Sequence, residues 1–151
     1  MQVLEPAVVA KLIGSDLGMS EWILVDQQRI NAFADVTGDH QFIHVDPVAA
    51  AATPFGGTIA HGFLTLSLIA SMMPEGAIVL KGIKMGLNYG FERVRFLLPV
   101  PSGARIRARH RLKNFEDKGG GRFVVTTEVT IEIEGQDKPA LIADWLGMQF
   151  C

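Results

Sequence analysis

The segment from residue 59 to residue 73 constrains the fold of this chain more than any other. It is apolar on nearly all sides of a helix, and it contains no Asp, Glu, Lys or Arg. A helix without a polar face has to be buried on all sides. The sequence therefore predicts one long helix over 59–73 in the core of the protein.

The second half of the chain alternates between polar and apolar residues with a period of two. Arginines occupy positions 105, 107, 109 and 111, with Ile106, Ala108, His110 and Leu112 as the other set. A second alternating run covers 123–133, and glycines at 119–121 form a turn between the two runs. These patterns are typical of half-buried antiparallel strands. Segments 79–96 and 141–150 are expected to supply further strands.

One buried helix followed by long antiparallel strands indicates a sheet that is wrapped around a helix. We therefore predict an α+β hot-dog fold, with an antiparallel β-sheet around a long central helix. The length of 151 residues fits a single domain over 1–151. Such a sheet leaves an edge strand, and pairing of edges across a two-fold axis is a common way to protect it. We therefore also expect a homodimer.

The first half of the chain is read mostly as helix and loop. Asp26 is the expected N-cap of a helix that buries Ile30, Phe33 and Ala34 and ends at Gly38. A polar, turn-prone stretch follows over 39–47. Asp46 then caps a short helix over 47–52, with Pro47 in its first turn.

Composition excludes several classes of function. A formal net charge of -2 argues against nucleic acid as the main partner, because phosphate binding needs an excess of Lys and Arg. Cys151 is the only cysteine, so the chain has no intrachain disulfide and no thiolate metal cage. Its apolar stretches are too short for a membrane span, and its N-terminus lacks the pattern of a signal peptide. We expect a cytoplasmic protein.

The polar stretch after Gly38 contains the first candidate for chemistry. A carboxylate and an imidazole five residues apart on a turn, here Asp39 and His44, can contact one water molecule and exchange a proton through it. The neighbours Phe42 and Ile43 would exclude bulk water. The alternative is structural: Asp39 would satisfy backbone donors in a turn, and His44 would be a core histidine.

The second candidate lies at the start of the apolar segment. Gly62 has no side chain to keep a ligand away from its backbone N–H, which could stabilise a developing oxyanion. The alternative for Gly62 is close packing of helix and sheet. We interpret His61 as a hydrogen-bonding residue rather than a catalyst. The arginines at 105–111 could contact phosphates, but we interpret them as a solvated strand face paired with Glu128 and Glu132.

Taken together, these elements resemble a known family. The sequence GDHQFIHVDP at 38–47, followed by an Ala-rich helix and FGGTIAHG at 55–62, resembles the motifs of the MaoC-like (R)-specific enoyl-CoA hydratases. Within that family it resembles the nodulation-protein-N-like branch, as does NYGFERVRF at 88–96.

The resemblance implies a reaction and a site. The reaction is reversible addition of water to a trans-2-enoyl-CoA, which gives a (3R)-hydroxyacyl-CoA without a metal or cofactor. Asp39 and His44 would be the catalytic pair, and the Gly62 amide would bind the thioester oxygen. The other substrate-binding residues would be Gln41, Ile43 and Asn88. The substrate would be an acyl-CoA thioester or its acyl carrier protein equivalent, bound near a dimer interface.

The sequence departs from the family wording at two places. Gln41-Phe42 stand where Asn-Pro is commoner, which moves the amide that could hold the pair or the substrate. Ala70 stands where some relatives have a serine, which puts that polar contact in doubt.

Two other functions compete with hydration. An acyl-CoA thioesterase on this fold usually has a carboxylate on the central helix, and segment 59–73 has none. A non-catalytic acyl-CoA-binding module would be expected to have lost Asp39 or His44. The sequence leaves open the direction of the reaction, the carrier and the acyl chain length.

Overall fold

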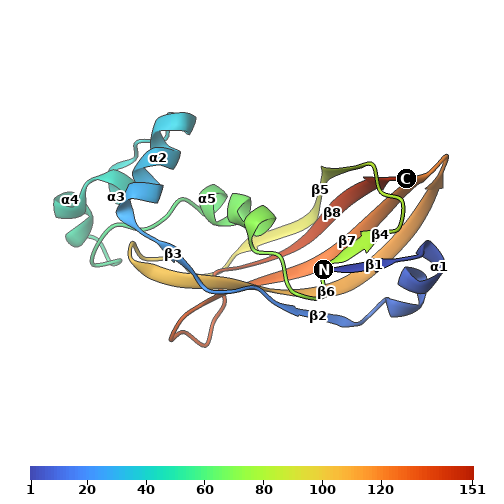
Figure 1. Cartoon of the computed structure of the whole chain (residues 1–151). Coiled ribbons are helices and arrows are strands. Elements are labelled where there is room, and N and C mark those ends of the chain that lie inside the picture. The colour runs from blue at the N-terminus through green and yellow to red at the C-terminus, as the bar shows by residue number, and fades with distance from the viewer.

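The computed structural model describes residues 1–151 and is built around a six-stranded antiparallel sheet. In the order of the chain its strands are β2 (Asp16–Met19), β3 (Ile23–Val25), β5 (Met85–Phe96), β6 (Ala104–Gly119), β7 (Arg122–Ile133) and β8 (Leu141–Phe150). The spatial order is β2-β6-β7-β8-β5, and β3 pairs with β6 beside β2. A separate parallel pair joins β1 (Gln2–Leu4) to β4 (Ile78–Leu80). The fold is the predicted α+β hot-dog fold (Figure 1).

The two faces of β6 and β7 differ as the alternation predicted. Ile106, Leu112 and Ile131 are completely buried on the inner face. On the outer face Arg107 pairs with Glu132 at 2.7 Å and Arg105 pairs with Glu134 at 3.0 Å. The interpretation of the arginines as a paired, solvated face is therefore confirmed, although Glu128 pairs with Arg93 from β5 instead.

The central helix is shorter than predicted. It comprises α5 (Gly62–Ser67) and the 3-10 turn η2 (Leu68–Ser71), and it packs through Leu64 and Ile69 into the core. The prediction of a continuous helix over 59–73 was wrong because residues 59 and 60 make extended contacts: Ile59 N–H donates to Ile43 O and Ala60 N–H donates to Val100 O. The prediction that this helix is buried on all sides was also wrong for a single chain, because the side chain of Phe63 is 68% exposed.

Three short helices lie together beyond one end of the sheet (Figure 1): α2 (Gln27–Thr37), α3 (Phe42–Val45) and α4 (Pro47–Ala51). The predicted caps are confirmed. Asp26 accepts a hydrogen bond from Arg29 N–H, Asp46 accepts from Val48 N–H, and Gly38 ends α2 with a left-handed φ of 76°. The one-turn helix α3 was not predicted.

The N-terminal residues form structure at the opposite end of the sheet. There α1 (Pro6–Val9) and η1 (Ala10–Leu12) pack beside β1 and β2 (Figure 1). The prediction that the first half is mostly helix and loop missed β1, β2 and β3. None of the helices combines the length and the apolarity that a membrane-spanning helix needs.

His110 on β6 makes the stability of the fold depend on pH. It is 1% exposed, and its Nε2–H donates to Met72 O at 2.8 Å. Burial lowers the pKa of His110 below its ordinary value of 6.5. The unfolded chain therefore binds a proton on this residue at a higher pH than the folded chain does, so the free energy of unfolding falls as the pH drops below the ordinary value.

We expect His110→Gln, which keeps a donor for Met72 O, to flatten this dependence. Urea denaturation at about pH 7.5 and about pH 5.5 should show a larger loss of stability in the wild type than in the variant. All other ionisable groups are common to both proteins and cancel in the comparison. Equal losses at equal protein concentration would contradict the assignment to His110.

Candidate active site

Asp39 and His44 lie close together at the end of the sheet that carries the short helices. The left-handed turn at Gly38 directs the chain out of α2 into Asp39, and the single turn of α3 then carries His44 inward. Polar side-chain atoms of Asp39, His44 and His61 lie within 4.8 Å of one another. The spacing that was predicted to bring the pair together therefore does so.

His44 is held in one tautomer. Its side chain is buried, and its Nδ1 lies 2.7 Å from the carbonyl oxygen of Ile59. A carbonyl oxygen only accepts, so the hydrogen of the neutral ring is on Nδ1 and the lone pair is on Nε2. That arrangement leaves Nε2 as the atom that can take a proton from a bound molecule.

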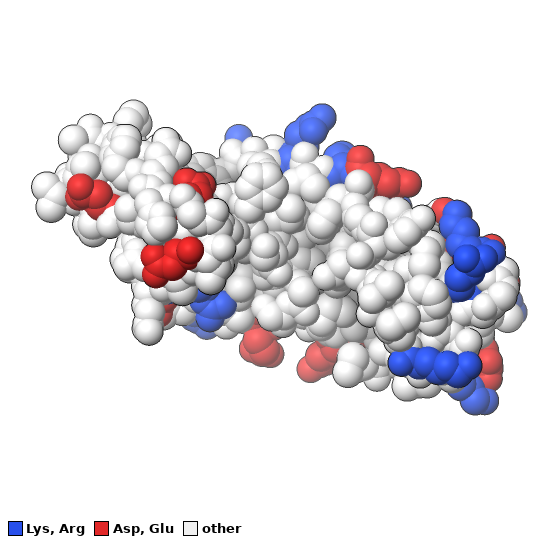
Figure 2. Space-filling model, turned by 90° about the horizontal axis from the view of Figure 1, so that it is seen from above, with Lys and Arg blue, Asp and Glu red and all other residues white.

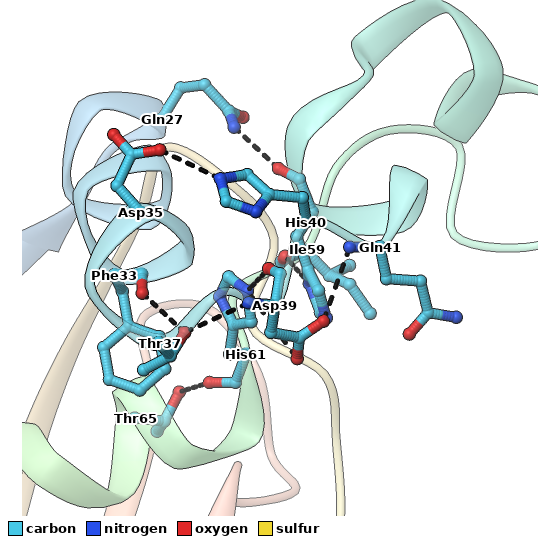
Figure 3. Close-up of polar contacts among 11 residues, drawn as sticks. Gln27, Phe33, Asp35, Thr37, Asp39, His40, Gln41, Ile59, His61 and Thr65 are labelled. Atoms are coloured by element: carbon cyan, nitrogen blue, oxygen red, sulfur yellow. Dashed lines mark hydrogen bonds and ion pairs between the residues drawn. The ribbon is translucent and has the colours of Figure 1, made fainter.

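The Asp39 carboxylate is only partly engaged. Its side chain is 54% exposed, and one oxygen lies 3.9 Å from His61 Nε2. Its other oxygen accepts a hydrogen bond of 3.4 Å from Gln41 N–H. The main chain of Asp39 is fixed more firmly, because His61 Nε2–H donates to Asp39 O at 2.9 Å. The carboxylate therefore keeps acceptor capacity on a backbone that is held in place (Figure 3).

A cavity of about 280 Å³ opens beside His44 and Gly62. Most of its wall is apolar, and it is lined in addition by Phe55, Ile59, Ala60, Thr65, Phe96, Leu97, Leu98, Pro99, Val100 and Ala140. As the first residue of α5, Gly62 has no intrahelical acceptor for its N–H, and no other backbone carbonyl receives it. The cavity thus combines a basic nitrogen, a free amide and an apolar wall.

The other predicted substrate-binding residues do not line this cavity. Gln41 is exposed, and its side chain points away from Asp39 (Figure 3). Ile43 takes part through its carbonyl oxygen, which accepts from Ile59 N–H at 3.0 Å. Asn88 lines a second cavity of about 250 Å³, between α5 and strands β5 and β8, which shares no residue with the first. The structure therefore brings Asp39 to His44, and His44 and Gly62 line one cavity. Gln41 and Ile43 contact the site only through main-chain atoms, and Asn88 lines a separate cavity.

The same cluster contains the residue types of a metal site, but its geometry does not suit one. The rings of His44 and His61 are stacked, with centroids 3.8 Å apart and an angle of 26° between their planes. The lone pair of an imidazole nitrogen lies in the plane of its ring, so the lone pairs of two stacked rings lie in nearly parallel planes. A tetrahedral zinc site needs ligands that converge on one point.

Sequence reasoning missed a residue that supports the cluster. Gln27, at the start of α2, donates from Nε2 to His44 O at 2.7 Å and accepts at Oε1 from the Thr58 hydroxyl at 2.5 Å. It joins α2, α3 and the segment before α5 in one contact. Its partners are 17 and 31 residues away along the chain, so no local pattern marks it.

The site sits on a chain with many known relatives. A family model described as the MaoC-like domain matches residues 8–134. Nodulation protein N of Rhizobium leguminosarum bv. viciae is 53% identical over 97% of this chain and 91% of its own length. The 3-hydroxyacyl-thioester dehydratase Z of Mycobacterium tuberculosis (strain ATCC 25618 / H37Rv) is 49% identical over 91% of both chains.

Solved structures agree with the fold. The R-hydratase of Pseudomonas aeruginosa, in its unliganded form, superposes with a TM-score of 0.69 and 25% identity. The match covers 91% of this chain and 81% of the hydratase.

Proposed function

Because the chain belongs to the MaoC-like family of dehydratases and hydratases, we propose that it is an (R)-specific enoyl-CoA hydratase that uses Asp39 and His44. One observation carries the proposal. The partly free Asp39 carboxylate lies close to the rings of His44 and His61, and His44 and Gly62, with its free N–H, line an apolar cavity at the start of α5.

The chemistry follows from the Asp39 carboxylate, His44 and the Gly62 amide. The thioester oxygen of a trans-2-enoyl substrate accepts a hydrogen bond from Gly62 N–H. A water between the Asp39 carboxylate and His44 Nε2 loses a proton to this pair as its oxygen bonds to the β-carbon. Negative charge then develops on the thioester oxygen, where the Gly62 amide stabilises it. The pair returns the proton to the α-carbon, so one water adds overall.

The relatives support hydro-lyase chemistry in either direction. One is named a 3-hydroxyacyl-thioester dehydratase, and a more distant one, 28% identical over 70% of this chain, is named an (R)-specific enoyl-CoA hydratase. An enzyme accelerates both directions of a reaction, so the same site serves both names. The thioesterase alternative lacks support, because segment 59–73 offers no carboxylate.

The test of the proposed function is the loss of enoyl-thioester absorbance when the purified protein is mixed with crotonyl-CoA. A coupled (R)-specific reductase reports whether the product is the (3R)-hydroxyacyl-CoA. Loss of absorbance with crotonyl-CoA or a longer enoyl-CoA supports the proposal. Loss only with an enoyl-acyl carrier protein would change the carrier, and no loss with any of them would refute hydratase activity.

We further propose that the protein acts as a homodimer. β5 is an edge strand of the sheet, and it exposes Met85, Leu87, Tyr89, Phe91 and Phe96. Phe63 of α5 contacts Phe96 edge-on and is also exposed. Charged side chains are sparse in the middle of the face that carries these elements (Figure 2). An apolar surface beside the free edge of a sheet is typical of an interface.

We expect light scattering to give twice the mass of the chain at micromolar concentration. Replacing Phe63, the most exposed of these aromatic residues, with glutamate places a charge on the apolar surface and should shift the protein towards the monomer. Val36→Glu on α2, where the side chain is 81% exposed outside this surface, is the matched control and should remain a dimer. A wild-type monomer would refute the proposal.

A further inference from the structure

His61 is the most constrained polar residue of the site, although the proposed chemistry assigns it no step. It is 3% exposed and directly precedes α5. Its ring lies between two others: it stacks on His44 with centroids 3.8 Å apart, and it meets Phe33 of α2 at 5.0 Å. Its Nε2 lies 2.9 Å from Asp39 O (Figure 3).

The hydrogen bond to Asp39 sets the tautomer of His61. Because a carbonyl oxygen only accepts, Nε2 carries the hydrogen. The other nitrogen, Nδ1, is buried and has no hydrogen-bond partner. A hydrogen on Nδ1 would be a buried donor without an acceptor, next to the ring of His44, so the hydrogen-bond pattern favours hydrogen on Nε2. Asp39 and His44 are the titratable groups that lie against it.

We infer that His61 is a positioning residue for the catalytic pair. Its Nε2–H fixes the backbone of Asp39, while its ring face sets the plane of His44. The kinetic part of this inference rests on the proposed function.

Two substitutions separate these two contributions. His61→Gln keeps a donor at the position of Nε2 but loses the ring. His61→Phe keeps a ring face for His44 but loses the donor. We expect kcat for crotonyl-CoA hydration to fall by at least ~10-fold in each variant, the lower range for disturbed acid–base groups. The acidic limb of the pH profile of kcat should move only in His61→Gln, where His44 loses its stacking partner.

A merely structural role predicts a different result. Partial unfolding lowers kcat through the fraction of active protein and leaves the pH profile unchanged, so equal profiles in both variants and the wild type would overturn the inference. More than half of the wild-type kcat in either variant would overturn it as well.

A measurement without substrate keeps this inference separate from the proposed function. Imidazole nitrogen NMR of ¹⁵N-histidine-labelled protein reports the protonation state of each ring, and the signals missing from His61→Phe identify His61. We expect hydrogen on Nε2 of His61, the nitrogen that donates to Asp39 O. Hydrogen on Nδ1 with none on Nε2 would overturn the inference even if the protein proves to be a hydratase. If no enoyl thioester reacts, the proposed function fails while the NMR result stands.

Discussion

Asp39→Asn and His44→Ala should each lower the turnover of crotonyl-CoA by at least ~100-fold, the usual scale for the loss of a general acid–base group. Asparagine keeps the shape of Asp39 but cannot hold the proton of the reacting water. Alanine removes the only nitrogen of His44 that is free to accept a proton, because Nδ1 is bound to Ile59 O. The initial rate of absorbance loss at saturating substrate measures both effects.

The fold is expected to survive both changes. Asp39 is half exposed, and circular dichroism should show an unchanged spectrum. His40→Asn is a matched control on the neighbouring residue, since His40 is exposed and pairs with Asp35 rather than with the site. Its turnover should remain within about threefold of wild type, as for a surface substitution away from the chemistry. Normal turnover in Asp39→Asn or His44→Ala, with an unchanged circular dichroism spectrum, would refute the mechanism.

The second large effect is expected from removal of one backbone N–H group. Gly62 is the first residue of α5, a position where proline is accepted because its missing N–H has no intrahelical partner. His61 before it already has φ of -58° and ψ of 138°, the extended conformation that proline requires of the preceding residue. Gly62→Pro therefore deletes the proposed oxyanion donor in a backbone that suits proline.

Gly62→Ala is the control for the added carbon. A Cβ at residue 62 lies 3.0 Å from the ring of Phe96, so both variants press on that ring, and only proline also removes the amide. We expect Gly62→Pro to turn over at least ~100-fold more slowly than Gly62→Ala, as for loss of an oxyanion donor. Equal rates in the two variants would show that the amide has no role in the reaction.

The sheet could be predicted from sequence because its signal is local and repeated. Ile106 and Arg107 on β6, for example, are adjacent in sequence and lie on the inner and the outer face of the sheet. β1 and β2 carry no comparable signal: they have three and four residues, and they form only where β4 and β6 offer partners. The start of the central helix was misplaced because hydrophobicity does not reveal that Ala60 N–H bonds to Val100 O.

The residues of the site also fall into those that the local sequence indicates and those that it does not. Asp39 and His44 were singled out because they lie five residues apart on a turn after a glycine-ended helix, and the resemblance to the MaoC-like hydratases implied their role as the catalytic pair. The contacts that hold them were not predicted, because they join residues distant along the chain. Gln27 reaches His44 across 17 residues, and His61 reaches Asp39 across 22. The position of Asn88 beside α5 likewise depends on the register of β5 with β8.

The extended segment before α5 links the short helices to the sheet through Ile59. Ile59 holds the ring of His44 through its carbonyl oxygen, bonds Ile43 O through its N–H, and pairs with Pro101 at the start of the sheet hairpin. The short helices α2, α3 and α4 therefore cannot orient the ring of His44 by themselves. We therefore expect the geometry of the site to form only when this segment lies in place between the two halves of the chain. A partly folded form without this segment in place would be inactive. Catalytic activity and the tertiary fold would then form in the same cooperative transition.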